Sequence, residues 1–519
     1  MSAYTPPASV LAAGQSHIGA LFHSAHQAHP QHTAITDGDR VFTYAQLEER
    51  SNRLAHYLLG QCLPTGGLAT RGLTTGDRVA ILAANCAEYF ELELAAAKSG
   101  LIVAALNWRL GGRELQHCID LVSPKLGFVS PKFLDHLNRL ELHGMPVITF
   151  GDAYESALAK ADPTYPGKEI PAETGLVILY TSGTTGLPKG ALISHRAMLA
   201  RGLIFTSEIV VPRYDHFVAW APMYHMASTD QGLAYLLRGG TVHMVDGYQP
   251  DCIIDLIEQF PMRWLLLMPG MIASFIEAVT ARQPSIKGLG CIGAMADLIP
   301  RQEIAEVTAL LNAPFLNTFG ATETGLGPAT GAFIDIGTAP ERLPKRQTAF
   351  CDIRLVDADD NEVPVGVPGE VSITGPSLFS GYWNSGEVNR EDFRGGRFHM
   401  GDVLRRNADG TLEYVDRVKY MIKSGGENIY PAEIEQVICA DERIETAVVV
   451  RKPDARWGEI PVLFVVPRDE SLTPAQITAL CDRELSRYKR PREIYFVTDE
   501  ELPRSTTGKI QRHMLEARV

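Results

Sequence analysis

The sequence predicts an α/β fold with a large N-terminal domain and a smaller α+β domain at the C-terminus. Its 519 residues are too many for one hydrophobic core, so two or more domains are expected. Strand-like and helix-like segments alternate as far as Glu323, which predicts parallel sheets packed by helices. From Cys351 to Thr374, short β segments separated by N-E and P-G turns predict a small antiparallel β subdomain.

The first elements follow from caps and apolar spacing. A helix is expected from His17 to Ala28, and two short strands are expected on either side of a D-G turn at residues 37–38. Thr43, with Gln46 three residues later, opens the next helix as a capping box. A strand at 78–82, a helix at 87–98 and a strand at 101–106 then form a β-α-β pattern.

Later strands are expected where short apolar runs are bounded by turn residues: 126–129, 147–150, 176–180, 217–222, 241–245, 263–269, 289–294 and 314–323. Ser194 is expected to cap the helix that follows residues 191–193. In the tail, helices are expected at 431–439 and 474–487, with strands at 446–451, 462–466 and 494–497. We place the domain boundary at Arg417 to Tyr420, which gives domains of residues 1–417 and 418–519.

Composition argues against several classes of protein. The net charge of -13 disfavours a nucleic-acid-binding protein, which would carry a basic face. The eight cysteines are scattered without a C-x-x-C pair, as expected for reduced thiols in the cytoplasm. Residues 1–15 lack the pattern of a secretory signal, and no apolar stretch has the ~20 residues that a membrane-spanning helix needs. A globular cytoplasmic protein without a stable membrane anchor is expected.

The densest group of ligand-binding residues is the loop Thr181-Ser182-Gly183-Thr184-Thr185-Gly186-Leu187-Pro188-Lys189-Gly190, after a buried strand. Glycines let the backbone approach a ligand closely, and consecutive N–H groups can form a concave anion site. The hydroxyls add donors, and Lys189 adds a point charge suited to phosphate. A solvated polar turn is the alternative, but turns rarely combine hydroxyls, glycines and a lysine so densely. The loop is therefore expected to bind a polyphosphate.

This loop lacks the spacing of the common nucleotide loop, because Gly190 stands where Ser or Thr would hold magnesium. It instead resembles the phosphate loop of the adenylate-forming superfamily, which contains acyl-CoA synthetases, peptide-synthetase adenylation domains and firefly luciferase. Further segments resemble motifs of that superfamily in the expected order: Phe319–Glu323, Gly396–Asp402, Asp416-Arg417, Lys419–Pro431 and Leu502–Ile510. The sequence departs from the frequent residues of these motifs at Arg397, Met400, Tyr420 and Ser505.

The resemblance implies a role for each motif. ATP or AMP would be bound by Thr181, Ser182, Gly183, Thr184, Thr185, Gly186, Lys189, Asn317, Thr318, Phe319, Gly320, Ala321, Thr322, Asp402, Arg417 and Lys509. The aromatic ring of Phe319 can stack on adenine. Magnesium would bind at Thr184 and Glu323, since a hard cation takes oxygen ligands. Catalysis would involve Lys509, Glu323, His225 and Thr181.

The resemblance also implies two steps and a mobile C-terminal domain. A carboxylate attacks the α-phosphate of ATP, pyrophosphate leaves, and the acyl-adenylate then reacts with the thiol of coenzyme A. Positive charge is needed at the reacting phosphorus because two anions must approach each other. Lys419 would be the hinge of the moving domain, and the residues facing the thiol would be Lys423, Ser424, Gly425 and Gly426. Expected cofactors and partners are ATP, Mg²⁺, coenzyme A and a small carboxylic acid, and a homodimer is left open.

The acid is expected to bind in an apolar, adaptable pocket formed by Tyr224, His225, Met226, Ser228, Met268, Met271, Gly293, Ala294, Phe319, Gly325 and Leu326. His225 would flank the acyl carboxylate, and a buried structural histidine is the alternative. No position near the pocket is clearly cationic, so a dicarboxylate is not expected. Adenylation domains of peptide synthetases place an aspartate after this histidine region, whereas the nearest acid here is Asp230. An aromatic or medium-chain aliphatic acid is expected.

Two other functions stay open at this point. A stand-alone adenylation enzyme would load a carrier-protein thiol and would release no free CoA thioester. A nucleotide-binding scaffold would lack acid-dependent pyrophosphate exchange. The intact set of Lys189, Glu323, Asp402, Arg417 and Lys509 argues against the scaffold.

Overall fold

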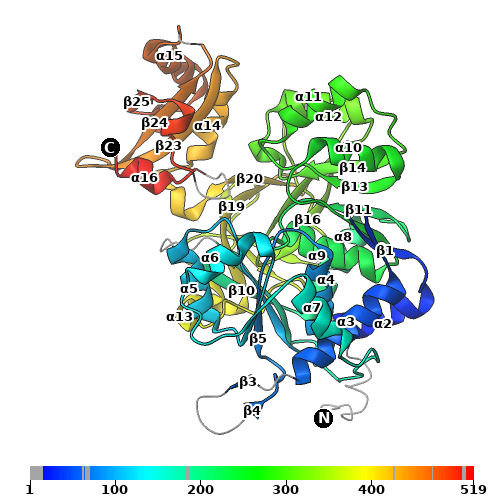
Figure 1. Cartoon of the computed structure of the whole chain (residues 1–519). Coiled ribbons are helices and arrows are strands. Elements are labelled where there is room, and N and C mark those ends of the chain that lie inside the picture. The colour runs from blue at the N-terminus through cyan, green and yellow to red at the C-terminus, as the bar shows by residue number, and fades with distance from the viewer. Residues whose placement is uncertain are drawn as a thin grey trace, which may run out of the picture. The chain divides into compact units, whose positions relative to one another are not determined.

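The computed structural model describes residues 16–60, 63–64, 70–181, 187–424, 427–469, 471–504 and 510–519. The chain forms two compact units, each built from sheets and helices (Figure 1). The first unit contains the residues up to Asp352 together with Thr374–Phe393, and the second contains Ile353–Ile373 and Arg394–Val519. In this division the predicted β subdomain belongs with the C-terminal residues. The expected boundary at Arg417 to Tyr420 concerns a hinge, which this division does not test, so it stays a prediction.

Three mixed sheets form the first unit. The largest has the order β10-β9-β6-β5-β7-β8, with β5 (Arg78–Leu82), β6 (Ile102–Ala105), β7 (Leu126–Val129), β8 (Val147–Thr149), β9 (Gly175–Thr181) and β10 (Lys189–Ser194). The second contains β11 (His216–Ala219), β12 (Thr241–Met244), β1 (Thr33–Asp37) and β2 (Arg40–Thr43). The third contains β13 (Met262–Leu266), β14 (Leu289–Ala294), β15 (Phe315–Ala321) and β16 (Gly325–Ile334). Strands within each sheet are parallel except at one edge, where β10, β2 and β16 run antiparallel. The predicted parallel sheets are confirmed.

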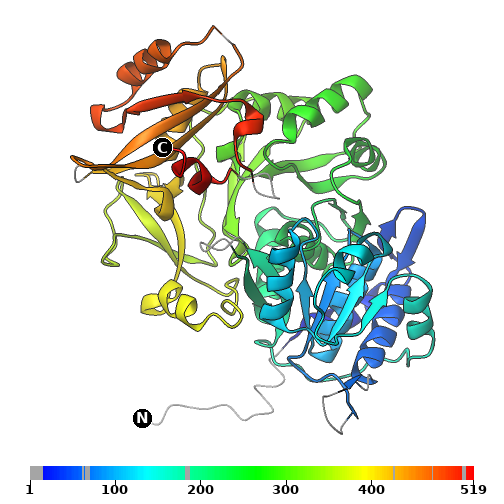
Figure 2. The same cartoon turned by 60° about the vertical axis from the view of Figure 1, so that its left-hand side comes forward.

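Helices pack on these sheets, as Figure 2 shows for the blue and cyan helices around the six-stranded sheet. They are α2 (Ile18–Ala28), α3 (Tyr44–Gly60), α4 (Ala87–Ser99), α5 (Gly112–Val122), α6 (Leu134–Asn138), α7 (Asp152–Ala159), α8 (His195–Glu208), α9 (Met226–Leu237), α10 (Pro250–Gln259), α11 (Ile272–Arg282), α12 (Arg301–Leu311) and α13 (Gly386–Asp392). Short 3₁₀ turns lie at Pro131–Phe133 and Ala296–Leu298, and the two-residue strands β3 (Leu63–Pro64) and β4 (Thr70–Arg71) pair with each other.

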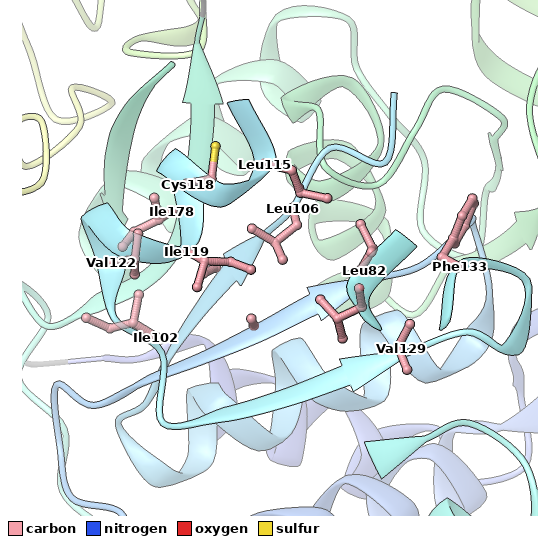
Figure 3. Close-up of a cluster of buried hydrophobic side chains, with 13 residues drawn as sticks. Leu82, Ile102, Leu106, Leu115, Cys118, Ile119, Val122, Val129, Phe133 and Ile178 are labelled. Carbon is pink, nitrogen blue, oxygen red and sulfur yellow. The ribbon is translucent and has the colours of Figure 1, made fainter. Parts of the chain in front are cut away.

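A core cluster shows why α5 lies on the six-stranded sheet. Its apolar residues Leu115, Cys118, Ile119 and Val122 follow helical spacing and are at most 2% exposed. Figure 3 shows these side chains gathered with residues of the neighbouring strands, such as Ile178 of β9, in one buried cluster. Burial of this face fixes α5 against β9, which is the strand that leads into the predicted phosphate loop.

The second unit contains an antiparallel sheet and an α+β part. The sheet has the order β17 (Asp352–Val356), β18 (Pro368–Thr374), β19 (Phe398–Arg406) and β20 (Leu412–Arg417). The α+β part joins β22 (Glu427–Ile429), β21 (Ile422–Ser424), β24 (Gly458–Pro467), β23 (Ile444–Asp454) and β25 (Glu493–Phe496), with α14 (Pro431–Cys439), α15 (Pro474–Glu484) and α16 (Arg512–Glu516). Short 3₁₀ turns are at Arg394–Gly396, Val418–Tyr420, Arg487–Lys489 and Asp499–Glu501. The expected antiparallel subdomain and α+β tail are both present.

Two expectations about the whole chain can be compared with the described residues. The seven cysteines in this part of the chain are free, as expected for reduced thiols. Among its helices, none has both the length and the apolar character that crossing a bilayer requires.

Candidate active site

The predicted phosphate loop connects two paired strands. Thr181 at the end of β9 lies opposite Lys189 at the start of β10. Residues 182–186, which include the metal-ligand candidate Thr184, lie outside the described residues. The Oγ1 atom of Thr181 is buried and has no hydrogen-bond partner in the described part of the chain, so it can bond to a ligand. Beyond β10, Ser194 Oγ accepts from the backbone N of Ala197 at 3.3 Å, which confirms the expected cap of α8.

Lys189 and Glu323 meet at one tyrosine that the sequence motifs did not identify. Lys189 Nζ lies 3.9 Å from the ring centroid of Tyr382 and 3.6 Å from Asp392 Oδ2. The hydroxyl of Tyr382 donates to Glu323 Oε1 at 2.7 Å. Burial raises the pKa of Asp392, and the nearby Lys189 opposes that shift. The tyrosine thus joins the lysine of the phosphate loop to the predicted metal-binding carboxylate.

Backbone hydrogen bonds on two sides hold Tyr382 in this position. The backbone N of Phe379 donates to the Glu323 carbonyl at 2.8 Å. The N of Trp383 donates to the Gly190 carbonyl at 2.8 Å, and Gly381 accepts from Leu192 N at 3.0 Å. The only hint in the sequence was a glycine followed by two aromatic residues at 381–383, which reads equally well as a packed turn.

We expect Tyr382→Phe to lower kcat/KM for ATP about tenfold, because a hydrogen bond to a charged group contributes about 1.5–3 kcal/mol. The ring under Lys189 remains in this variant, so the loss isolates the bond to Glu323. The measurement is the initial rate of acid-dependent pyrophosphate release across ATP concentrations. Tyr165→Phe is the matched control, since its ring stacks on His23 in another part of the same unit. An unchanged kcat/KM in the Tyr382 variant would contradict the proposed positioning of Glu323.

The segment before Glu323 has the predicted form of a strand followed by a turn. Gly320 must be glycine, because a Cβ there would lie 2.0 Å from the Gly325 carbonyl oxygen. Thr324 Oγ1 accepts from Ala321 N at 2.9 Å and closes the turn. The ring of Phe319 is only 2% exposed, so an adenine could stack on it only after neighbouring side chains moved. Its stacking role stays a prediction.

Some predicted ligand residues use their side chains to hold the fold. Asn317 is fully buried: its Oδ1 accepts from Ala296 N at 3.0 Å, and its Nδ2 donates to the Leu343 and Pro344 carbonyls at 3.1 Å. Ser228 is also fully buried, and its Oγ donates to the Ala221 carbonyl at 2.6 Å. Thr318 is 4% exposed. In this arrangement, a ligand at these three residues could bind to their backbone groups.

His225 caps helix α9 and is exposed, so the alternative of a buried structural histidine is wrong. Its Nδ1 accepts from the backbone N of Ala227 at 3.1 Å. In the neutral imidazole the proton must then be on Nε2, which can donate a hydrogen bond. Among its predicted neighbours, Tyr224 is 7% exposed, and burial raises the pKa of its hydroxyl to about 12.

A pocket lies between α8, α9 and the start of β16. It is lined by Arg201, Gly202, Phe205, Met226, Asp230, Gln231, Ala234 and Leu326, of which Met226 and Leu326 were predicted. Arg201 lines this pocket, but only Met226 and Leu326 of the expected acyl residues do so, and the expectation that no cation lies near the acyl pocket stays a prediction. The Arg201 guanidinium lies 3.2 Å from Asp230, so the pair adds no net charge. Other predicted acyl residues, Met268, Met271, Gly293, Ala294, Phe319 and Gly325, do not line this pocket.

In the second unit, Asp402 and Arg417 lie opposite each other on β19 and β20. Arg417 Nε donates to Asp402 Oδ1 at 2.9 Å, and the Asp402 side chain is 4% exposed. Burial raises the pKa of neighbouring Asp416 to about 6, and the nearby Arg512 opposes the shift. Arg397, which departs from the motif, donates to the Ser372 hydroxyl at 3.1 Å and to its carbonyl at 3.0 Å. The structure thus brings the two predicted ribose-binding residues together.

The predicted hinge residue Lys419 is exposed and lies in the turn Val418–Tyr420. The ring of Tyr420, another departure from the motif, has Lys419 Nζ at 4.8 Å and the Arg512 guanidinium at 4.8 Å from its centroid. Arg512 also pairs with Glu435 at 2.6 Å. Tyr420 therefore attaches the turn to α16, which explains the aromatic residue at this position.

Three predicted functional residues of this unit lie outside the described residues: Gly425, Gly426 and Lys509. The residues beside them are described. Lys423 is exposed, and its backbone N donates to Glu459 Oε2 at 2.8 Å, while Ser424 lies opposite Gly458. Arg504 and Ile510 form an isolated antiparallel bridge on either side of residues 505–509.

Comparisons with known proteins identify the family. The family model described as AMP-binding enzyme matches residues 21–383, and the one described as AMP-binding enzyme C-terminal domain matches 433–509. The chain is 31% identical to the feruloyl-CoA synthase of Amycolatopsis sp over 93% of this chain and 94% of that one. It is 30% identical to the indoleacetate--CoA ligase of Aromatoleum aromaticum, again over 93% and 94%. The structure of ATP-bound MatB from Rhodopseudomonas palustris has a TM-score of 0.82 at 25% identity, covering 97% of this chain and 99% of that one. The chain belongs to the AMP-binding enzyme family, as the order of its motifs predicts.

Proposed function

We propose that the protein is an ATP-dependent carboxylate–CoA ligase that forms an acyl-adenylate and then an acyl-CoA, releasing pyrophosphate and AMP. The observation that carries the proposal is the arrangement of Lys189 and Glu323 around Tyr382, beside the strands that frame the phosphate loop. A positive group and a carboxylate held at one place suit a nucleotide polyphosphate and its counterion. Two relatives are named for aromatic acids, which supports an aromatic acid here, with a medium-chain aliphatic acid as the alternative.

Magnesium fits the residues around Glu323. One carboxylate oxygen accepts from Tyr382, and the other is a hard oxygen ligand of the kind that Mg²⁺ takes. That part of the chain contains no group of three or more His, Cys, Asp or Glu that could hold a metal. This suits Mg²⁺, which binds through one or two carboxylates plus phosphate oxygens rather than in an all-protein cage. When bound, the ion would neutralise charge on the phosphates as pyrophosphate leaves.

The side chains of this chain divide the remaining work. Lys189 and the hydroxyls of residues 181–186 hold the β- and γ-phosphates, which depart as pyrophosphate. His225 presents Nε2–H toward the acyl carboxylate and orients it for attack on the α-phosphate. Asp402 and Arg417 bind the ribose, and Lys509 supplies positive charge at the reacting phosphorus. Rotation at Lys419 exchanges Lys509 for the segment of Lys423 to Gly426 before the thiol attacks.

A release assay tests the proposal. Purified protein is incubated with ATP, Mg²⁺ and a panel of aromatic and aliphatic carboxylic acids, with and without CoA, and pyrophosphate and acyl-CoA are measured. We expect acid-dependent pyrophosphate release that CoA accelerates, together with a free CoA thioester. Acid-dependent pyrophosphate exchange without a CoA thioester would favour the carrier-protein alternative. Absence of exchange with every acid would contradict an adenylating enzyme. We place the protein in the cytoplasm, because its cysteines are scattered in the sequence and the seven within the described residues are free.

A further inference from the structure

The pocket between α8 and α9 contains a buried acceptor that no described residue satisfies. The Asp230 side chain is 9% exposed, and its Oδ2 accepts from Arg201 Nη1 at 3.2 Å. Its other oxygen, Oδ1, is buried without a hydrogen-bond partner in the described part of the chain. Buried polar groups are normally hydrogen-bonded, because an unmade bond leaves the cost of desolvation uncompensated.

The arginine that binds the other oxygen of Asp230 is already committed. Arg201 is held by three bonds, since Nε donates to the Ser377 carbonyl and Nη2 to the Thr322 carbonyl, both at 2.9 Å. It cannot turn toward Oδ1 without breaking them. Gln231, the next pocket residue, accepts at its Oε1 from Trp264 Nε1 at 2.8 Å, and its Nε2 does not donate to Oδ1 of Asp230. Glu93 is a second buried carboxyl within electrostatic reach of Asp230, and both of its oxygens also lack a partner among the described residues.

Asp230 lies on the helix that follows His225, at a distance that the far end of an acyl group could reach. Met226, Asp230 and Ala234 are spaced four residues apart, so they share one face of α9. Met226 follows His225, which flanks the acyl carboxylate in the proposed function. Asp230 lies one turn farther along, about 6 Å at 1.5 Å per residue, roughly the length of an aromatic ring. Arg201 also donates from Nη2 to the carbonyl of Thr322, the residue before Glu323, so the pocket lies next to that part of the chain.

We propose that Asp230 selects the acid, by accepting a hydrogen bond from a hydroxyl at the end of the acyl group distant from its carboxylate. This inference rests on the proposed function and narrows its substrate class to hydroxylated acids. The space between the lining residues is about 270 Å³ including its open side, of which about 10 Å³ can hold the centre of a water molecule. A hydroxyl is of that size. Phe205, Met226, Ala234 and Leu326 provide apolar surface around such a hydroxyl, and the ring or chain that carries it would extend from the open side of the pocket.

The charges of the pocket favour a neutral donor. An ammonium group would meet the Arg201 guanidinium beside the carboxylate, and a second carboxylate would be repelled by Asp230. A hydroxyl faces neither repulsion and supplies the missing donor. Sites that hydrogen-bond a substrate hydroxyl reject the analogue that lacks it, because the protein group is then left unpaired.

The variant Asp230→Asn turns the acceptor into a donor of the same shape. Because Arg201 Nη1 donates to the Oδ2 position, the amide oxygen should remain there and the NH₂ group should replace Oδ1. The probes are three acids with the same ring and linker, whose distal position carries a hydroxyl, a hydrogen or a ketone. We expect the wild-type protein to prefer the hydroxylated acid over the unsubstituted one by at least about tenfold in kcat/KM for pyrophosphate release. In Asp230→Asn we expect that preference to fall below about threefold and the ketone acid to become the better substrate.

Two further measurements keep the test decisive. Asp215→Asn is the matched control, since this buried carboxylate accepts from Arg263 N at 2.9 Å and does not line the pocket. It should retain the wild-type order of acids. If Asp230→Asn does not fold, Ala234→Leu narrows the same pocket without touching the ion pair and should penalise the hydroxylated acid more than a short unsubstituted acid.

An equal rate with hydroxylated and unsubstituted acids in the wild type, or an unchanged order in Asp230→Asn, would overturn the proposal. If no acid supports pyrophosphate release, the proposed function fails. The role of Asp230 is then tested separately by measuring acid binding through the Tm of the protein. Hydroxylated acids should raise the Tm of the wild-type protein and leave that of Asp230→Asn unchanged. Equal Tm shifts in the two proteins would refute the role of Asp230.

Discussion

Replacing Lys509 by alanine is expected to slow acyl-adenylate formation by about 100-fold or more, since removing one preorganised donor from a developing anion typically costs 10²–10³ in rate. Thioester formation from pre-formed acyl-adenylate should keep its rate. In that step the thiol attacks the acyl carbon, so no cation is needed at an attacked phosphorus. Lys509 belongs to a short segment between Arg504 and Ile510, which pair with each other. Replacing the Lys509 side chain leaves the backbone pairing of Arg504 and Ile510 in place, so the expected loss reflects the missing charge.

Single-turnover measurements of the two half-reactions provide the test. Lys419→Pro is the reciprocal variant, because proline fixes φ and restricts the residue before it, which should hinder a rotation at the hinge. It should impair thioester formation more than adenylation, whereas Lys419→Ala should leave both steps near the wild-type rates. If Lys509→Ala slowed both half-reactions equally, this division of labour between the two conformations would be refuted.

Local features of the sequence were enough to predict most of the elements of the fold. The strand expected at 289–294 is β14, and Ser194 caps α8 as predicted. These features act within a few residues, so a single sequence shows them. A single sequence does not show which strands pair with each other. Ile35 of β1 pairs with Val242 of β12, about two hundred residues away, and only tertiary packing sets that partner. The family resemblance supplied the architecture that the local patterns could not.

The residues of the candidate site were also predicted only in part. Motif spacing identified Lys189 and Glu323, but Tyr382 between them lies 59 residues beyond Glu323 and belongs to none of the motifs considered. Arg201 was missed because an arginine within a helix usually belongs to a solvated face, whereas here it is 2% exposed. Asn317 was assigned to the nucleotide because it adjoins a motif, yet its side chain bonds to the backbone of Ala296, Leu343 and Pro344 and so holds the fold. The order of the motifs along the chain predicts which segments form the site. The direction of each side chain then decides which residues face the ligand.

Glu323→Gln is expected to lower kcat for pyrophosphate release by about 100-fold, equivalent to about 2.7 kcal/mol of transition-state stabilisation. The amide keeps the shape of the carboxylate and can still accept from the Tyr382 hydroxyl. What it loses is the negative charge that makes oxygen a strong ligand of a hard cation. The effect should therefore depend on the concentration of Mg²⁺, and excess MgCl₂ should restore part of the rate.

Titration with MgCl₂ at fixed ATP separates this role from simple damage to the fold. In the wild type, Mg²⁺ should tighten ATP binding measured by calorimetry, and in Glu323→Gln that dependence should shift to higher Mg²⁺. Asp392→Asn is the matched control, since this carboxylate lies 3.6 Å from Lys189 and its loss should change ATP affinity without the same Mg²⁺ dependence. Identical Mg²⁺ curves for wild type and Glu323→Gln would remove Glu323 from the metal site. Tyr382 would then hold that carboxylate to shape the turn after β15, with the cation bound elsewhere.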